Sequence, residues 1–426
     1  LNLSNTDFIR TTEERHKLSV QHLWNELEKS GDIYLSKYSG WYSVSDEAFY
    51  NEDEIETKNS IKISTVSGSK VEWVEEESFF FKLSKWQNKL LDYYEKNPDF
   101  ILPRSRRNEV VSFVKGGLKD LSISRKSFSW GIKVPSNDKH IIYVWLDALT
   151  NYISALKYPN KEENLYQNFW PADVHIIGKD ILRFHAVYWP AFLLAAKIPL
   201  PKRVYGHGWI LSGEEKMSKS RGNILDPLEI IENYGLDPLR YYLIKEVSFG
   251  NDGTISKEKL EDCINSDLAN NYGNFCQRVL AFAEKNCDSK IPNNIQFTDD
   301  DKKILNTFSQ NIDSLRIFMD RQNLNEYVDF IINSLFNANK YFNDQEPWKK
   351  KNNKTRLNTI IYTSLELIRK ISIMFYPIMP LTSVKSLSVF NIKENDIKFE
   401  NIRNNELLKP NAKILKSTIL FKKIIK

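Results

Sequence analysis

Residues 173–197, DVHIIGKDILRFHAVYWPAFLLAAK, decide the fold. The apolar run 174–177 predicts a short strand, Gly178 marks a turn, and a long apolar pattern with helical spacing follows. A strand that passes through one tight turn into a helix is the first half of a parallel βαβ unit.

One neighbouring stretch repeats this arrangement, and a second adds a further strand. Residues 139–158, KHIIYVWLDALTNYISALKY, predict a strand over 141–146 followed at once by a helix, and residues 203–211, RVYGHGWIL, supply another strand. Strand, helix, strand, helix, strand in this order predicts a parallel sheet covered by helices on both faces.

Polar and aromatic residues follow each predicted strand, where an open parallel sheet binds its ligands. Trp145 and Tyr152 alone are compatible with core aromatics, Asp147 and Asp180 with helix caps, and His185 with a buried core histidine. Together they provide aromatic walls, two carboxylates and an imidazole. Such a set suits a small amphipathic ligand beside a nucleotide.

The stretch 213–223, GEEKMSKSRGN, places Lys216, Lys219 and Arg221 between two glycines. A solvated surface loop is the ordinary interpretation, because the chain has 60 Lys+Arg against 55 Asp+Glu. The alternative is a loop that closes on a phosphate-rich ligand.

The chain begins with a predicted helix over 12–31, capped by Thr12 and ended by Gly31. Residues 32–115 alternate short aromatic pieces of period two with polar turns, which predicts an inserted α+β module. The remainder is predicted to be helical, with amphipathic stretches at 255–285, 300–320, 322–343 and 355–378.

Composition excludes several classes of protein. The net charge is +5 in 426 residues, which permits a polyanionic partner without requiring one. No apolar run reaches membrane-spanning length and no secretory signal opens the chain, so we expect a cytoplasmic or organelle-matrix protein. The three cysteines never form a CxxC pair and are interpreted as plain buried thiols, and the six-residue spacing of His16 and His22 argues against a metal pair.

The chain carries a series of segments in this order: DLSISR, WGIKVP, YVWLDALTNY, IIGKDILRFHAVYWPA, HGW, KMSKSRGN and DPLRYYL. In this ordered series it closely resembles the methionyl-tRNA synthetases, which are class I aminoacyl-tRNA synthetases. The resemblance implies an α/β fold class: an incomplete Rossmann-type parallel sheet, an α+β connective insertion and an all-α anticodon-binding bundle. The implied domains are the end of the first Rossmann half with a linking helix (1–30), the connective insertion (31–125), the second Rossmann half (126–212), the KMSKS loop with a stem-contact region (213–262) and the helical anticodon-binding domain (263–426).

The resemblance also implies a reaction and its site. Such enzymes activate methionine with ATP and Mg²⁺ to methionyl-adenylate and transfer the methionyl group to the 3′ end of tRNA(Met). Lys216 and Lys219 would be catalytic, because long ammonium side chains can reach the phosphates of the leaving group. The implied ATP-binding residues are Gly178, Asp180, His207, Lys216, Ser218 and Lys219. The implied methionine-binding residues are Trp145, Ala148, Tyr152, Phe184, His185 and Trp189.

In the helical domain, Asn274, Arg278 and Trp348 match the positions of the family's anticodon readers. An exposed Trp can stack on an unpaired base, and Arg can bond the edge of one. Without the resemblance, a buried or capping Trp348 after Pro347 is an equally good interpretation.

Two features depart from the family pattern. The HIGH signature is missing, which we attribute to a chain truncated before that segment, and we expect a fragment of this kind to be weak or inactive. Where many relatives carry a CxxC zinc knuckle, this chain has Ser43 and Asp46, so we expect no structural zinc and no other metal site. The sequence carries no recognisable dimerising module, and we expect a monomer.

Three alternatives remain open. A synthetase for leucine or valine would need a larger editing insertion than the segment between Gly31 and Arg125 allows. A catalytically inactive tRNA-binding fragment is compatible with the missing HIGH signature. A nucleotidyltransferase with the same sheet is disfavoured by the long helical C-terminal part.

Overall fold

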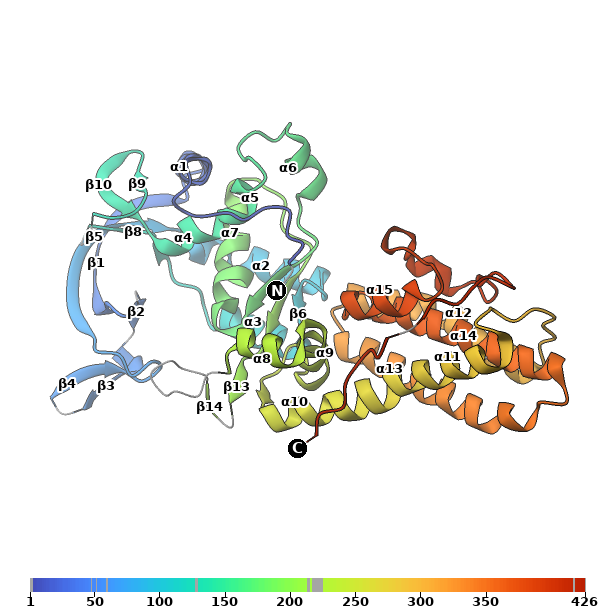
Figure 1. Cartoon of the computed structure of the whole chain (residues 1–426). Coiled ribbons are helices and arrows are strands. Elements are labelled where there is room, and N and C mark those ends of the chain that lie inside the picture. Colours follow the sequence, from blue (N-terminus) through green and yellow to red (C-terminus); the bar gives the residue numbers. More distant parts are fainter. Residues whose placement is uncertain are drawn as a thin grey trace. The chain divides into compact units, whose positions relative to one another are not determined.

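The structure is a computed structural model that describes residues 3–46, 48–50, 52–58, 60–126, 129–212, 215–216, 225–416 and 418–425. Residues 2–207 form one compact unit, the N-terminal unit, and residues 208–426 form a second, the C-terminal unit (Figure 1). The finer division into five regions stays a prediction.

A three-stranded parallel sheet lies in the N-terminal unit. Its strand order is β11 (His175–Gly178), β12 (Val204–His207) and β6 (Ile101–Leu102). The predicted strand at 174–177 is therefore confirmed. The single strand predicted at 203–211 is wrong in its extent, because the structure has two strands there, β12 and β13 (Ile210–Ser212), which belong to different sheets. Strand β6 comes from within the predicted insertion. Helices α2 (Gln87–Lys96), α3 (Arg104–Lys115) and α7 (Trp189–Ala195) are among those that contribute buried apolar residues to the core of this unit.

The strand predicted at 141–146 is wrong in both extent and pairing. Strand β10 (Asn137–Ile142) ends earlier and pairs antiparallel with β8 (Ser124–Arg125) and β9 (Lys133–Val134). Helix α4 (Val144–Leu149) starts two residues later. The buried residues Leu146, Leu149 and Ile153 recur at spacings of three and four. This spacing favours a helix here, although the apolar run alone suggested a strand.

The first helix, α1 (Glu14–Lys29), starts two residues after the predicted cap. Glu13 is its N-cap and makes no side-chain cap bond, so the prediction for Thr12 is wrong. Gly31 has φ +73°, the left-handed conformation that ends helices, which confirms the predicted stop.

The predicted α+β module contains a four-stranded antiparallel sheet. Its strands, in spatial order, are β2 (Ala48–Tyr50), β1 (Ile33–Ser43), β5 (Glu72–Phe81) and β7 (Leu121–Ser122). Figure 1 shows the long strands β1 and β5 side by side. A separate hairpin is formed by β3 (Ile55–Lys58) and β4 (Ile61–Ser64), and η2 (Leu83–Trp86) leads from β5 into α2.

The C-terminal unit opens with a small three-stranded sheet and three helices. The strands, in spatial order, are β14 (Glu215–Lys216), β13 (Ile210–Ser212) and β15 (Gly253–Ile255). The helices are α8 (Pro227–Tyr234), α9 (Leu236–Glu246) and α10 (Lys257–Cys263).

A bundle of long helices follows and confirms the four predicted amphipathic stretches (Figure 1). Its elements are the π-helical η6 (Ile264–Gly273), α11 (Asn274–Cys287), α12 (Asp299–Asp320), α13 (Leu324–Asp344) and α14 (Lys354–Phe375). Helix α15 (Pro380–Ser388) lies beyond the four predicted stretches and begins at a proline. Proline is tolerated in the first turn of a helix, where its missing N–H has no partner anyway.

Helix α14 is the centre of this bundle, because every residue from Leu357 to Phe375 is buried. The burial includes an ion pair: Arg369 Nε lies 2.6 Å from Glu366 Oε2. Glu366 Oε1 also accepts hydrogen bonds from the backbone N–H groups of Leu407 and Leu408, at 2.8 and 2.7 Å. The buried pair thus fastens the segment after η9 (Phe399–Ile402) to the central helix.

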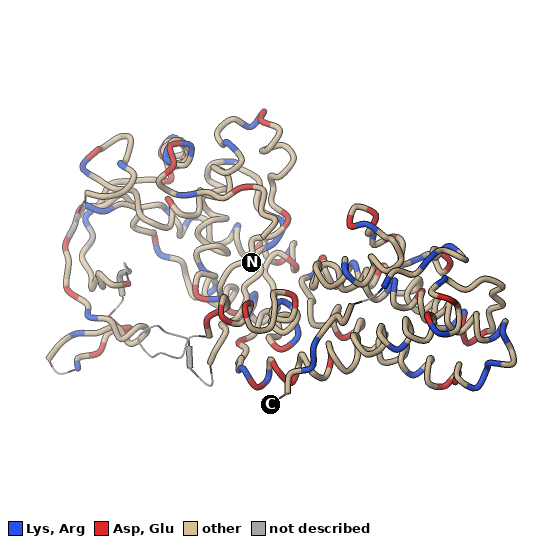
Figure 2. Tube along the Cα trace, viewed as in Figure 1, with Lys and Arg blue, Asp and Glu red and all other residues tan. Residues whose placement is uncertain are grey.

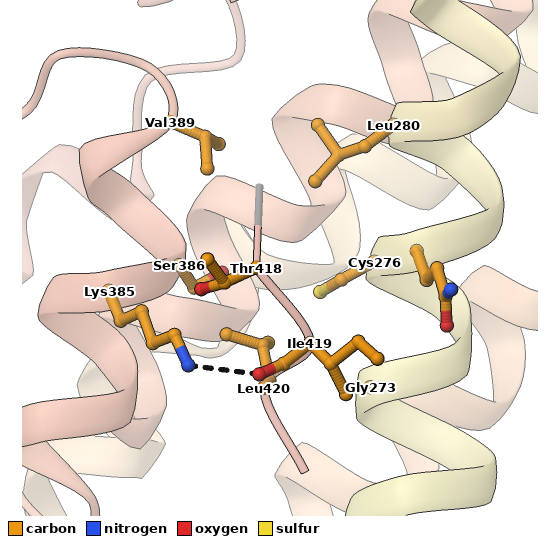
Figure 3. Close-up of a pocket in the computed structure, with 10 residues that line it drawn as sticks. Gly273, Cys276, Leu280, Lys385, Ser386, Val389, Thr418, Ile419 and Leu420 are labelled. Carbon is orange, nitrogen blue, oxygen red and sulfur yellow. Dashed lines mark hydrogen bonds between the residues drawn. The ribbon is translucent and has the colours of Figure 1, made fainter. Parts of the chain in front are cut away.

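The C-terminal segment returns along the bundle. Thr418 to Leu420 pass between α15 and α11 beside a cavity of about 80 Å³, and Lys385 Nζ donates a hydrogen bond to the Ile419 carbonyl (Figure 3). Further on, Asn265 of η6 both accepts from the backbone N–H of Ile424 and donates to its carbonyl, at 2.8 and 3.0 Å.

Both signs of charge are distributed over each unit (Figure 2). The small net positive charge of the chain therefore does not mark a binding face by itself. Among the described helices, none combines the length and the apolar character needed to span a membrane.

We predict that Arg369→Ala lowers the free energy of unfolding by about 3–5 kcal/mol, because it leaves the buried Glu366 carboxylate without its cation. Urea denaturation followed by circular dichroism would measure the change. The control is Arg316→Ala, whose ion pair with Glu400 is exposed and should contribute about 0–1 kcal/mol. Equal losses in the two variants would contradict the prediction.

Candidate active site

The carboxyl ends of β11 and β12 meet at one edge of the parallel sheet. Their register pairs Gly178 with His207, so two of the predicted ATP-binding residues are neighbours. A Cβ atom at position 178 would lie 2.7 Å from Asp180 Oδ1, so a larger residue there would displace the Asp180 side chain. Asp180 itself is exposed on η3 (Lys179–Ile181), directly after the strand. These three residues therefore share one edge, as the sequence predicts.

Predicted methionine-binding residues come together from two elements. Trp145 on α4 stacks on Phe184 of the π-helical turn η4 (Phe184–Tyr188), with ring centroids 3.7 Å apart and planes inclined by 9°. The His185 ring lies 6.3 Å from that of Trp145. Ala148 lies on α4, one helical turn after Trp145. The pair of stacked rings forms a flat apolar surface suited to a thioether.

Tyr152 lies on α5 (Asn151–Ser154), and its hydroxyl oxygen is 2.8 Å from His185 Nε2. The centroid of its ring is 6.4 Å from that of Trp189. His185 Nδ1 lies 2.9 Å from the carbonyl of Ile181 and must donate to it, since a carbonyl only accepts. The neutral ring therefore accepts the Tyr152 proton at Nε2.

Burial keeps this wall uncharged. It lowers the pKa of His185 below its ordinary range, although the hydrogen bond to the Ile181 carbonyl opposes the shift. Burial also raises the pKa of Tyr152 to about 12. An uncharged wall of rings selects an apolar side chain by shape.

His175 is a neighbour of this cluster that the sequence analysis missed. Its ring stacks on Tyr152 with centroids 3.8 Å apart. Burial, with a smaller electrostatic contribution from the nearby His185, lowers the pKa of His175 to about 3. The alternation of residues along the predicted strand could have identified it. His175 and Ile177 lie on the inward face of β11, and the exposed Ile176 lies between them on the outward face.

A second missed residue is His16 on α1. Its Nε2 lies 2.7 Å from Asp147 Oδ1 and its Nδ1 lies 2.9 Å from Ser154 Oγ. Asp147 is thus bonded to α1 and is not a helix cap. The pair joins α1 to the two helices that carry Trp145 and Tyr152, so it fixes the base of the aromatic cluster.

The predicted phosphate-binding loop is described only in part. The backbone of Lys216 belongs to β14 and pairs with Leu211 of β13. The side chain of Lys216, together with Ser218 and Lys219, lies outside the described residues. Their roles stay predictions.

Two of the three predicted anticodon readers, Arg278 and Trp348, contact Phe342 of α13. The Arg278 guanidinium lies 5.5 Å from the centre of the Phe342 ring and donates to Asn343 Oδ1 at 2.7 Å. Trp348, on η7 (Pro347–Lys349), contacts the same ring edge-on at 6.4 Å and keeps 41% of its surface exposed. Asn274 is exposed one helical turn before Arg278. Trp348 is therefore accessible to a base, as anticodon reading requires.

At Ser43 and Asp46, where many relatives carry a zinc knuckle, the side chains form hydrogen bonds with their neighbours. Asp46 accepts hydrogen bonds from the hydroxyls of Ser67 (2.5 Å), Tyr50 (2.8 Å) and Ser69 (2.8 Å). Burial disfavours the charged carboxylate, but these hydrogen bonds outweigh it and hold the pKa of Asp46 below its usual range. Ser43 Oγ accepts from the backbone N–H of Asp46, as Ser64 Oγ does from that of Ser67.

These residues do not fit a zinc ion. Structural zinc is held by thiolates and imidazoles, whereas this cluster offers hydroxyls and a single carboxylate whose two oxygens already accept hydrogen bonds. No group of three His, Cys, Asp or Glu in the described residues is placed to hold a metal. The expected absence of zinc stays a prediction.

Comparisons with known proteins now identify the family. A family model described as "tRNA synthetases class I (M)" matches residues 1–62 and 56–280, and one described as "Anticodon binding domain of methionyl tRNA ligase" matches residues 291–426. The chain belongs to the methionyl-tRNA synthetase family. Membership confirms the resemblance seen in the sequence and the class I synthetase fold.

Individual relatives agree. The methionine–tRNA ligase of Rickettsia felis is 49% identical over 425 residues, which cover 99% of this chain and 82% of the relative. The methionine–tRNA ligase of Brucella suis is 50% identical over 403 residues, which cover 94% of this chain and 78% of the relative. A structure of Mycobacterium tuberculosis methionyl-tRNA synthetase in complex with methionyl-adenylate matches with a TM-score of 0.94 and 43% identity, covering 99% of this chain and 83% of that one.

We predict that His175 makes the fold sensitive to acid. Its pKa in the folded protein, about 3, is below the ordinary value near 6.5, so the unfolded chain binds the extra proton and stability falls as the pH drops below about 6.5. Between pH 7 and pH 5 this contributes a loss of about 2 kcal/mol. Urea titrations at the two pH values should show a loss smaller by that amount in His175→Phe. An identical pH dependence in both proteins would contradict the prediction.

Proposed function

We propose that this protein activates methionine with ATP and charges tRNA(Met). The methionine carboxylate attacks the α-phosphorus of ATP, forming methionyl-adenylate and releasing pyrophosphate. The hydroxyl of the terminal tRNA ribose then attacks the methionyl carbonyl and releases AMP. Support comes from the aromatic cluster of Trp145, Phe184, Tyr152 and His185, which adjoins the strand ends at Gly178 and His207 in a chain of the methionyl-tRNA synthetase family.

Each group of residues has a role in the proposal. The methionine side chain lies among Trp145, Ala148, Tyr152, Phe184, His185 and Trp189, where uncharged rings accept a thioether and exclude hydrated side chains. ATP binds at the sheet edge, with close backbone approach at Gly178 and polar contacts from Asp180 and His207. Methionyl-adenylate in the Mycobacterium tuberculosis relative supports this pairing of ligands.

Charge development governs the first step. Negative charge accumulates between the α-phosphorus and the departing pyrophosphate, and cations placed there lower the barrier. Lys216 and Lys219 supply two such cations, Ser218 adds a hydroxyl contact, and Mg²⁺ bound to the phosphates supplies further charge when present. The backbone pairing of Lys216 in β14 supports a fixed base for the loop.

The C-terminal bundle selects the tRNA in this proposal. Asn274, Arg278 and Trp348 read the unpaired anticodon bases by hydrogen bonding and stacking. The arrangement around Phe342 supports this role, because it holds Arg278 and Trp348 against one ring while Trp348 stays exposed. We expect the enzyme to act as a monomer in the cytoplasm or an organelle matrix. No comparison supports the alternative of a catalytically inactive fragment.

The proposal predicts methionine-dependent ATP–pyrophosphate exchange by the full-length gene product. The double variant Lys216→Ala, Lys219→Ala should lose about 10²–10³-fold in kcat for exchange, because it removes charge from the transition state. The control is Lys197→Ala, Lys202→Ala, which removes two exposed lysines of the N-terminal unit and should change exchange by less than about twofold. Exchange at wild-type rate in the first variant would contradict the proposal.

A second prediction tests tRNA selection. Trp348→Ala should lower kcat/KM for tRNA charging by about 5- to 150-fold, the range expected for loss of one stacked base, and leave exchange unchanged. The matched control is Phe336→Ala, an exposed aromatic residue of the same bundle, with 64% of its surface accessible. If both variants charge tRNA alike, the bundle does not read bases through Trp348.

A further inference from the structure

Three hydrogen-bonded side chains of the N-terminal unit lie behind the aromatic cluster and have no part in the chemistry proposed above. His16 of α1 is fully buried between Asp147 of α4 and Ser154 of α5. Its Nε2 atom lies 2.7 Å from Asp147 Oδ1, and its Nδ1 atom lies 2.9 Å from Ser154 Oγ. A carboxylate only accepts hydrogen bonds, so Nε2 donates to Asp147. One imidazole therefore links three helices.

Serine, histidine and carboxylate in this order are the groups of a nucleophilic triad, but burial excludes that role here. Ser154 keeps none of its surface exposed, and its hydroxyl also lies 3.2 Å from the carbonyl of Asn151. A nucleophile must come within reach of its substrate, which this hydroxyl does not. The series of hydrogen bonds therefore holds helices in place and does not attack a ligand.

The helical segment formed by α4 and α5 carries two stripes of side chains. The stripe that joins the aromatic cluster has spacings of three and four residues and consists of Trp145, Ala148 and Tyr152. The stripe that contacts α1 contains Asp147 and Ser154, which are two helical turns apart. At about 100° per residue, the two stripes lie on roughly opposite sides of the segment. Helix α1 thus holds this segment from the side opposite the rings.

Two further turns of α1 contact the chain that follows α5. Ser19 Oγ, one turn after His16, lies 2.5 Å from the carbonyl oxygen of Tyr158. The ring of His22 contacts the ring of Tyr158 edge-on, with centroids 5.3 Å apart. The buried apolar face of α1 anchors the helix in the core of the unit. The position of α4 and α5 is therefore fixed by a helix that is itself firmly packed.

The opposite wall of the cluster has a separate support. His185 Nδ1 is bonded to the carbonyl of Ile181, in the segment that leaves β11. Across the cluster, Trp145 stacks on Phe184 at 3.7 Å and the Tyr152 hydroxyl contacts His185 Nε2 at 2.8 Å. Rings stacked at this distance leave no room for a third group. A side chain bound between the walls replaces these contacts, and the support behind each wall then sets their separation.

We propose that His16 and Asp147 are specificity-determining residues that act by positioning. They fix the separation of the two walls of the methionine pocket, and so they limit the length of the thioether side chain that the enzyme activates. The inference rests on the proposed function and adds to it a source of amino-acid selection outside the pocket lining. His16 and Asp147 act through α4 and α5 and touch no substrate.

The test compares methionine with ethionine, whose side chain has one more methylene beyond the sulfur. One methylene in a well-fitting pocket changes kcat/KM by about 10- to 200-fold. We measure ATP–pyrophosphate exchange by the full-length gene product and take the ratio of kcat/KM for methionine to that for ethionine. His16→Ala should lower this ratio about fivefold or more, mainly through a higher KM for methionine, with KM for ATP within about twofold of wild type. A loss of folded protein alone lowers both rates equally and leaves the ratio unchanged.

Two further variants separate the hydrogen bond from the bulk of the ring. His16→Gln keeps an N–H donor near the position of Nε2 and should restore the ratio to within about twofold of wild type. Asp147→Ala should behave like His16→Ala. Because the side chain of Asp147 is 16% exposed, this variant removes less buried volume and carries the test if His16→Ala does not fold.

The matched control is Asp32→Ala, at the far end of α1. The Asp32 side chain is 2% exposed, its Oδ1 lies 2.7 Å from Lys85 Nζ, and its Oδ2 accepts from Ser30 Oγ at 2.7 Å. The control should lower stability and leave the ratio at its wild-type value. An unchanged ratio in His16→Ala and Asp147→Ala, no recovery in His16→Gln, or an equal change in Asp32→Ala would overturn the positioning role alone. Absence of methionine-dependent exchange in the wild type would overturn the proposed function and this role with it.

Discussion

The parallel register of β11 and β12 is the constraint on which the candidate site depends. Pairing Gly178 with His207 brings two strand ends to one edge, and the chain continues from Gly178 directly into η3 and then η4. Phe184 and His185 follow within two turns. A shift of this register by one residue would turn the strand's buried residues outward and separate this sheet edge from the aromatic cluster.

The aromatic cluster is kept neutral by its connections as much as by its burial. The Ile181 carbonyl fixes the proton of His185 on Nδ1, which leaves Nε2 to accept from Tyr152. His16 and Asp147, on the other side, hold the helices that carry Trp145 and Tyr152. Polar groups thus lie at the base of the cluster and at the sheet edge, while the rings between them carry no charge.

Local patterns in the sequence predict much of this molecule. Helices α12, α13 and α14 follow from apolar residues at helical spacing, and β11 follows from an apolar run that ends at a glycine. The family resemblance added residues such as Phe184 and Trp348, whose types alone allow a core role. Predictions failed where two periods compete within a few residues, as at the boundary between β10 and α4.

Long-range pairs could not be predicted from local patterns. His16 and Asp147 are 131 positions apart, and neither has a neighbour that signals the other. Strand β6 has two residues, too few to show a period, and only its pairing with β12 identifies it. The hydrogen bonds that Asp46 accepts from Ser67 and Tyr50 were not predictable either, because serine, tyrosine and aspartate are common in turns of any kind. In each case the information lies in the contact and not in either segment.

The clasp between Asn265 and Ile424 means that the bundle starts and finishes at the same place. A chain segment whose two ends meet is topologically a closed ring. In an isolated bundle this order can be rearranged by circular permutation: a short linker would join residue 424 to residue 265, and new ends would open in a turn such as 391–393. The helices would keep their neighbours in space while their order along the chain changed. The packing of α14 could then be studied separately from the order of the helices in the sequence.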